Sequence, residues 1–425
     1  MLGRSLIVAL FAGAAVPSMA LMSPVATADD ADDSLIALMM GGTAMPTPSE
    51  FWQNGIITDY IDPATGGSYT PVLVSTPESF SSTSVSEGLA DLQAAMDQHT
   101  APYLVEGYSQ SAVIAVDEEI ALMQSGQAPP DATFLLLGSL NRPDGGLFER
   151  FPGLLIPGLP AFEFNGAEPI DAGIPTIDVA TQYDFFADFP QFPINPIADL
   201  NAILGIYYAH GAYGEGLVPK DIPPFWQLSE PLTGPYASEY VLGSTELVKQ
   251  IDGDATFYFI PTTDLPLLDP LRSLGVPESV LNIFQPALQV LVEAGYDRSI
   301  PFGDPTPAEL IPTVDPATFT LEFANGLVQG ANNALELFGT QLPYFPEIES
   351  FFASAEAWTE ANIGVPYDHV VTELNNAFDP FTLFAETEGT LAQGIQVLLN
   401  DTGIQQLLLD PLLGLVGTLG GLVTS

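Results

Sequence analysis

The chain has 425 residues, of which 47% are hydrophobic and 14% are charged, and it contains no cysteine. This composition allows a large buried core and excludes disulfides, thiol nucleophiles and thiolate metal sites. The 53 acidic and 7 basic residues give a formal net charge of −46, which disfavours binding to nucleic acid and to anionic membrane surfaces.

The first residues have the layout of a secretory signal peptide. Arg4 precedes an apolar run over residues 6–16, and the small residues Ala26-Thr27-Ala28 stand directly before two aspartates. A positive start, a short apolar segment and a small-x-small site are typical of a cleaved export signal. We therefore expect residues 1–28 to be a signal peptide, cleaved after Ala28, and the protein to be secreted or held in the cell envelope. A retained N-terminal anchor is the alternative.

Short apolar runs and amphipathic segments alternate along the chain that follows. Runs closed by glycine or polar residues are typical of strands buried on both faces, whereas apolar residues at helical spacing predict crossover helices. The alternation predicts an α/β fold with a mostly parallel central sheet flanked by helices. The strands are expected at 34–40, 71–75, 102–106, 132–138, 176–183 and 256–261, and the first helices at 85–99 and 110–123.

The remaining segments differ in character. Residues 141–173 are rich in proline and glycine and predict loops over the sheet edge, and residues 185–201 predict an irregular segment followed by a short helix. Helices are expected again at 278–296 and 351–360. We place the main domain at residues 29–330 and a helical C-terminal extension, which could pack on it, at residues 331–425.

Ser109 lies between a predicted strand and a predicted helix, in the stretch Gly107-Tyr108-Ser109-Gln110-Ser111. A nucleophile elbow presents its serine at such a strand-to-helix turn, with small residues two positions before and after it. Ser111 departs from the G-x-S-x-G pattern but is small enough for the close approach of strand and helix. We therefore predict that Ser109 is the nucleophile of an α/β-hydrolase fold.

A nucleophilic serine needs a base, and the chain has three histidines. In this fold the order along the chain is nucleophile, acid, histidine. His99 precedes the serine and ends a predicted helix, and His369 lies late in the helical region. His210 ends an apolar stretch and stands before Gly211, where a loop could carry it to the sheet edge. We predict His210 as the base, with a structural histidine as the alternative.

The acid should fall between Ser109 and His210, directly after a strand. Asp184 follows the predicted strand at 176–183, and Asp188 comes one helical turn later. Asp184 is the predicted acid and Asp188 the alternative. The oxyanion hole is expected from the backbone N–H of Gln110 and from Thr43 in the loop after the first strand, with the Thr43 hydroxyl as a further donor.

Metal and cofactor sites are not indicated by the sequence. Three dispersed histidines without cysteine supply no cluster of metal ligands, and Gly41-Gly42 lacks the glycine and lysine of a phosphate-binding loop. We therefore expect neither a metal nor a cofactor.

Residues 34–300 resemble the mycobacterial PE-PPE domain. The stretches that carry the resemblance are, in order, G-G-T-A-M-P-T-P at 41–48, T-P-E at 76–78, G-Y-S-Q-S-A at 107–112, N-R-P-D-G-G at 141–146, T-Q-Y-D-F-F-A-D-F-P at 181–190, Y-Y-A-H-G at 207–211 and L-P-L-L-D-P-L-R at 265–272. The resemblance implies a serine α/β-hydrolase fold similar to that of cutinases. Its G-x-S-x-S/G pentapeptide accommodates Ser111, and its triad implies Ser109, Asp184 and His210. We expect a member without a PE or PPE N-terminal module, with the signal peptide in that place.

The resemblance also implies a choice of activities. Esterase action on acyl esters is the first expectation, with a lipid or acyl ester as substrate, no nucleic-acid or metal partner, and peripheral association with the envelope. Acyl transfer onto envelope glycolipids such as acylated trehaloses is the alternative, and a non-catalytic envelope protein is a third reading. The sequence does not indicate an oligomeric state.

Overall fold

The computed structural model describes residues 35–129, 131–154, 163–213, 248–262, 264–313, 316–337, 339 and 375. Several predicted features lie outside these residues: the signal peptide and its cleavage site, His369, the helix at 351–360 and, apart from Asn375, the chain beyond residue 339.

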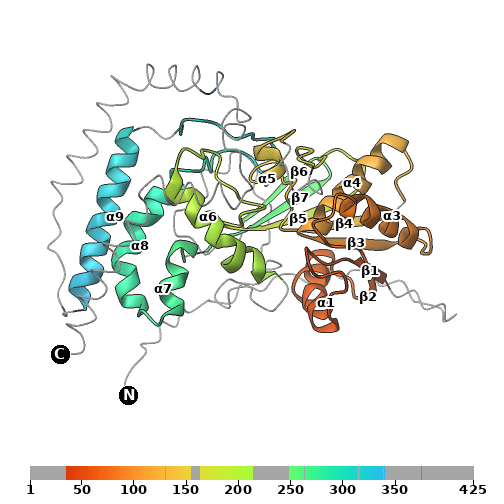
Figure 1. Ribbon diagram of the computed structural model, residues 1–425, viewed down its shortest axis with the longest axis horizontal. Helices are drawn as coiled ribbons and strands as arrows, with labels where there is room; N and C mark the ends of the chain where they lie inside the picture. Colours follow the sequence, from red (N-terminus) through yellow and green to blue (C-terminus); the bar gives the residue numbers. More distant parts are fainter. Residues whose placement is uncertain are drawn as a thin grey trace, which may run out of the picture. The chain divides into compact units, whose positions relative to one another are not determined.

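Seven strands form one sheet in the order β2-β1-β3-β4-β5-β7-β6 (Figure 1). Every neighbouring pair is parallel except β6 and β7, which are antiparallel. All six predicted strands are present, and the predicted α/β-hydrolase type of fold is confirmed. The strands are β1 (Leu35–Met39), β2 (Tyr69–Leu73), β3 (Tyr103–Tyr108), β4 (Thr133–Leu137), β5 (Thr176–Thr181), β6 (Val248–Asp252) and β7 (Ala255–Ile260).

The central strands are buried on both faces, as their continuous apolar runs predict. On β1, Ala37 and Met39 pack on one face against α1 (Glu50–Ile56) and the π-helical turn η1 (Ile57–Ile61), which α2 (Asp62–Thr65) follows. Leu38 packs on the other face against α3 (Ser84–Met96) and α4 (Gln110–Ser125). The sheet is therefore a rigid platform whose parallel strands all end at one edge.

The segment expected to be irregular holds a longer helix than predicted, which is a correction. Helix α6 spans Pro196–Tyr208, and the Asn195 side chain accepts hydrogen bonds from the N–H groups of Ile197 and Ala198 at its start. Proline at the first helical position and asparagine at the cap both stabilise a helix N-terminus. His210 therefore follows a helix, in the short 3₁₀ turn η2 (His210–Ala212), rather than a loop.

The part of the chain after the sheet is helical. A short helical segment runs through η5 (Pro266–Leu268) and α7 (Asp269–Ser273). Helices α8 (Glu278–Glu293) and α9 (Pro316–Glu336) then lie side by side (Figure 1). The domain boundary at residue 330 stays a prediction, and that position falls inside α9. Within the described ranges, no helix has both the length and the apolar character needed to cross a membrane.

Candidate active site

Ser109 stands at the turn between β3 and α4 in a strained backbone conformation. Its φ and ψ are 58° and −116°, which a residue with a side chain rarely adopts. Its N–H donates to the Leu137 carbonyl oxygen at 3.0 Å, so the turn is fixed to the end of β4. This geometry is the one a nucleophile elbow requires to push a serine out at the sheet edge.

The two small residues of the pentapeptide have different tasks. A Cβ on Gly107 would lie 2.5 Å from the carbonyl oxygen of Ser111, so the close approach of β3 and α4 requires glycine there. The Ser111 hydroxyl is fully buried; it accepts from the Tyr108 N–H at 2.8 Å and donates to the Tyr108 carbonyl at 3.1 Å. Ser111 therefore stabilises the turn with two hydrogen bonds that a glycine could not form.

Removing the Ser111 hydroxyl should loosen the elbow. We expect Ser111→Ala to lower the unfolding free energy by about 1–3 kcal/mol, because the Tyr108 N–H loses its acceptor at a partly buried position. The measurement is urea denaturation. Ser125→Ala is the matched control, since Ser125 is exposed at the other end of α4 and its hydroxyl donates only to the Leu122 carbonyl. Equal stability of the two variants would contradict this role of Ser111.

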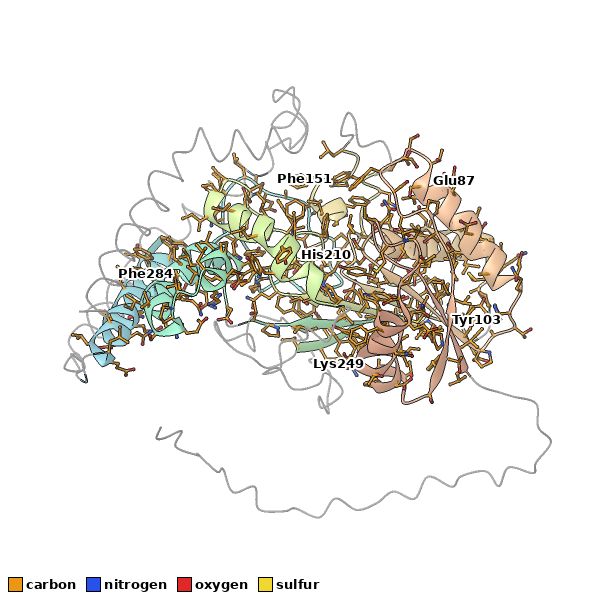
Figure 2. All side chains as sticks on the ribbon, turned by 60° about the horizontal axis from the view of Figure 1, so that its bottom comes forward. Glu87, Tyr103, Phe151, His210, Lys249 and Phe284 are labelled. Carbon is orange, nitrogen blue, oxygen red and sulfur yellow. The ribbon has the colours of Figure 1, made fainter. Side chains whose placement is uncertain are left out.

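His210 is held against the elbow by aromatic side chains. Tyr108 stacks on the imidazole with a ring-centroid distance of 5.0 Å and an angle of 23°, and its hydroxyl donates to the His210 carbonyl at 2.7 Å. Phe186 contacts the imidazole at a centroid distance of 4.5 Å. His210 is only 6% exposed. Figure 2 shows it beside the ribbon of α6, among closely packed side chains.

Asp184 is fully buried and contacts the His210 ring. Nδ1 of His210 lies 2.8 Å and 2.9 Å from the two carboxylate oxygens of Asp184. The same carboxylate accepts from the Tyr213 hydroxyl at 3.0 Å and from the Phe186 N–H at 2.8 Å. A carboxylate is a pure acceptor, so this contact assigns the proton of a neutral imidazole to Nδ1 and leaves Nε2 free to accept another.

Glycine allows the helix that precedes His210 to approach the turn that carries Asp184. A Cβ on Gly205 of α6 would lie 1.9 Å from the Tyr183 carbonyl oxygen, so only glycine fits there. At the end of β4, a Cβ on Gly138 would lie 2.8 Å from His210 Cε1 and 3.1 Å from an Asp184 carboxylate oxygen. The three predicted residues thus converge at the carboxyl ends of β3, β4 and β5.

The second nitrogen of the imidazole stands ready for a partner. Nε2 of His210 is buried and has no hydrogen-bond partner among the described residues. Ser109 Oγ is not hydrogen-bonded to it in this arrangement. Contacts between nucleophile and base are often long before substrate binds, so the geometry is compatible with a catalytic pair.

The alternative acid has a different partner. Asp188 forms a bidentate ion pair with Arg298, at 2.6 Å and 3.1 Å, and does not contact the imidazole. Asp178, inside β5, is paired with the buried Arg142 of the N-R-P-D-G-G stretch. The structure therefore brings Asp184, and neither of the other two aspartates, to His210.

The loop after β1 faces the elbow. A Cβ on Gly42 would lie 3.1 Å from Ser109 Cβ. The N–H groups of Ala44 and Met45 donate to the carbonyl oxygens of Glu78 and Gly42, whereas the Thr43 N–H has no acceptor in the described part of the chain. Thr43 thus has a backbone donor to spare in this loop, as do Gly41 and Gly42 among the described residues.

Gln110 is the first residue of α4, where backbone N–H groups have no partner within the helix. Its side chain accepts from Ser84 Oγ at 3.1 Å and donates to the Ser79 carbonyl at 3.0 Å. These bonds tie the segment after β2 to the elbow. Of the two predicted oxyanion donors, Gln110 therefore directly follows Ser109, and Thr43 lies in the loop that faces the elbow.

Two buried carboxyl groups, those of Glu78 and Glu106, were not predicted from the sequence. Glu78 accepts from Thr76 Oγ1 at 2.8 Å, and burial raises its pKa to about 8. Both carboxyl oxygens of Glu106, on β3, lack a partner among the described residues. Burial, and to a smaller extent the nearby Glu78, raise the pKa of Glu106 well above its usual value. The only sign of these buried groups in the sequence is that Glu106 lies inside an apolar strand run.

Glu78 makes stability depend on pH. Its pKa is 4.5 ordinarily and about 8 in the folded protein, so the folded state binds a proton that the unfolded state has lost in this window. The contribution of Glu78 to the unfolding free energy is complete below pH 4.5. It falls, by about 4 kcal/mol at most, as pH rises to 8. We expect urea denaturation to show a lower unfolding free energy at pH 8 than at pH 5, and Glu78→Gln to flatten the slope. Glu87→Gln, on an exposed residue of α3, should leave the slope unchanged; the same slope in Glu78→Gln would refute the assignment.

The PE-PPE domain matches residues 47–297 of the chain. The chain belongs to the PE-PPE domain family. This confirms the resemblance seen in the sequence.

No group of three or more histidine, aspartate or glutamate side chains in the described ranges is placed to hold a metal ion.

The curated relatives are proteins of Mycobacterium tuberculosis. Esterase PE16 is 39% identical over 297 residues, which are 66% of this chain and 52% of that protein. The PE family protein PE3 is 35% identical over 364 residues, or 80% of this chain and 71% of the relative. Diacyltrehalose acyltransferase Chp2 is 26% identical over 332 residues, or 72% of this chain and 86% of the relative. The chain thus spans about half the length of the esterase.

Proposed function

We propose that the protein is an exported serine hydrolase that cleaves acyl esters through an acyl-enzyme on Ser109. The observation that carries the proposal is the buried contact between Asp184 and Nδ1 of His210 beside the strained turn at Ser109. The match to a protein named as an esterase supports the choice of an ester over other acyl compounds.

The proposed reaction uses the triad twice. Nε2 of His210 takes the proton of Ser109 Oγ as the oxygen attacks the ester carbonyl, and Asp184 stabilises the imidazolium that forms. The N–H groups of Gln110 and Thr43 hold the oxyanion. As the intermediate collapses, the alcohol leaves with the proton from His210. Water then attacks the acyl-enzyme with His210 again as base; the bond between the acyl group and Ser109 Oγ breaks as His210 returns the proton to that oxygen, and the free acid departs.

Hydrolysis of p-nitrophenyl acyl esters tests this proposal. The wild-type protein should release p-nitrophenol in a burst equal to the amount of enzyme, followed by a slower steady rate, if deacylation limits turnover. A series of acyl chain lengths then defines the preferred substrate. Equal rates for wild type and Ser109→Ala would reject the proposal.

Acyl transfer to a sugar or lipid hydroxyl is the second candidate. The chemistry is shared up to the acyl-enzyme, and exclusion of water decides which acceptor takes the acyl group. The match to a diacyltrehalose acyltransferase over 86% of that relative's length favours this alternative. It is tested by product analysis with trehalose or a glycolipid present: transfer requires acylated acceptor in excess of free acid, and free acid alone rejects it.

Export rests on the N-terminal layout. We propose that the signal peptide is removed after Ala28, so that the mature chain starts at Asp29. N-terminal sequencing of the protein recovered from culture medium and from the cell envelope tests this. A chain that still carries the apolar run at residues 6–16 in both fractions would indicate a retained anchor.

A further inference from the structure

We propose that Asp188 and Arg298 are positioning residues that hold Asp184 in contact with His210. The proposal rests on the proposed function, because it assigns a task within the same triad. Asp188 has the right chemistry for a triad acid and lies four residues from Asp184, yet its carboxylate faces the other way. Its hydrogen bonds there indicate its role.

Asp188 forms two hydrogen bonds with the turn that carries Asp184. Its carboxylate oxygen Oδ2 accepts from the Tyr183 N–H at 2.8 Å, and its own N–H donates to the Asp184 carbonyl at 2.7 Å. Both contacts are buried, and Asp188 is only 3% exposed. The peptide unit before Tyr183 and the one after Asp184 are therefore both fixed by one residue.

This turn needs such support because its backbone is strained. Tyr183 has a φ of 67°, a left-handed conformation that a bulky side chain rarely adopts. Strained residues persist only where the surrounding structure over-determines them. Released from the turn, Tyr183 would relax and carry the neighbouring Asp184 carboxylate away from Nδ1 of His210.

Arg298 in turn holds Asp188. Its Nη1 and Nη2 atoms lie 2.6 Å and 3.1 Å from the two oxygens of that carboxylate, a bidentate pair that fixes orientation as well as charge. Nε of Arg298 binds Glu293 at the end of α8 at 3.0 Å, and the guanidinium lies 4.0 Å from the Tyr296 ring centroid. The arginine is thus itself fixed from three sides.

The contacts close into a ring around the strained turn. Glu293 accepts from the side chain of Gln182, the residue directly before Tyr183, at 2.8 Å. Gln182 also accepts from the Thr262 N–H at 2.9 Å, just after β7. Gln182, Glu293, Arg298 and Asp188 therefore enclose Tyr183, and the ring anchors the acid-bearing turn to α8 and to the sheet.

The experiment compares Arg298→Met with Arg272→Met in the full chain. Arg272 is the matched control, because it forms three carboxylate ion pairs, with Asp264, Asp269 and Glu278, and is similarly buried. We expect Arg298→Met to lower kcat for p-nitrophenyl esters about 10- to 100-fold with KM within about twofold, because the triad is misplaced but the substrate site is kept. Arg298→Lys should recover part of kcat, since lysine keeps the charge without the bidentate geometry. Arg272→Met should keep the wild-type kcat.

A proton NMR signal provides a readout that does not depend on activity. The Nδ1 proton of His210, shared with Asp184, should give a strongly downfield resonance that disappears in His210→Gln. We expect this resonance to be lost or broadened in Arg298→Met and kept in Arg272→Met. Asp188→Asn, which keeps an oxygen for the Tyr183 N–H but loses the charge, is the second variant if Arg298→Met does not fold.

The outcomes separate this proposal from the proposed function. A wild-type kcat and an unchanged resonance in Arg298→Met would overturn the positioning role. Equal losses in the two arginine variants would also overturn it, because they would reflect general stability. If the wild-type protein hydrolyses no ester, the proposed function fails, and the resonance alone decides whether Arg298 holds Asp184 against His210.

Discussion

Ser109→Ala is expected to lower kcat for p-nitrophenyl ester hydrolysis about a million-fold, the loss found when the nucleophile of a serine triad is removed. The oxygen that forms the acyl-enzyme disappears, and His210 alone cannot replace it. A residual rate about 10³-fold above that of water should persist, because substrate binding and the oxyanion donors remain. The measurement is steady-state hydrolysis with purified variants, with the uncatalysed rate subtracted.

Ser125→Ala is the control for this loss. Ser125 lies at the exposed end of the same helix, far along α4 from the elbow, so its replacement should leave kcat at the wild-type value. A Ser109→Ala variant that retains more than about a tenth of the wild-type rate would mean that another residue is the nucleophile.

Asp184→Asn is expected to lower kcat about 10⁴-fold, the loss measured for the equivalent change in a serine triad. The single amide oxygen would be drawn to the Phe186 and Ala187 N–H groups, which now donate to the Asp184 carboxylate. The amide NH₂ would then face the imidazole and make Nδ1 an acceptor. Nε2 would carry the proton and could no longer accept one from Ser109. The measurement is kcat across a pH series, so that a shifted optimum is not mistaken for a loss.

Asp188→Asn is the informative comparison for Asp184→Asn. Both changes remove one buried carboxylate from the same turn, but only Asp184 contacts the imidazole. The loss in Asp188→Asn should therefore lie near 10- to 100-fold, well short of the Asp184 value. A larger loss in Asp188→Asn than in Asp184→Asn would reverse the assignment of the acid.

Much of the sheet could be predicted because its strands are buried on both faces and appear as short apolar runs. The exception is β6, an antiparallel strand at the sheet edge whose V-K-Q-I-D sequence is half polar. The helix α1 was missed because Gly55 and the following isoleucines weaken a helical pattern. What stabilises it is a Ser49 cap and the burial of Trp52 and Ile56 against the sheet.

In the candidate site too, local sequence patterns predict some residues, whereas others depend on distant contacts. Ser109 could be predicted from its local turn, and His210 from the scarcity of histidines and their order. Which of Asp184 and Asp188 contacts His210 could not be predicted locally, since both follow β5 within one turn. It depends on Arg298, which lies 110 residues after Asp188 in the sequence. The burial of Glu78 and Glu106 was equally hidden among 53 acidic residues, since it is set by packing of distant segments.

Labelling with a fluorophosphonate probe tests most directly that Ser109 is a nucleophile activated by His210. The probe forms a covalent bond only with an activated serine, and mass spectrometry of the digested protein locates it. We predict one label per chain on the peptide that contains Ser109, no label in Ser109→Ala, and much slower labelling in His210→Gln. Absence of labelling in the wild type, or the same labelling rate in Ser109→Ala, would contradict this account.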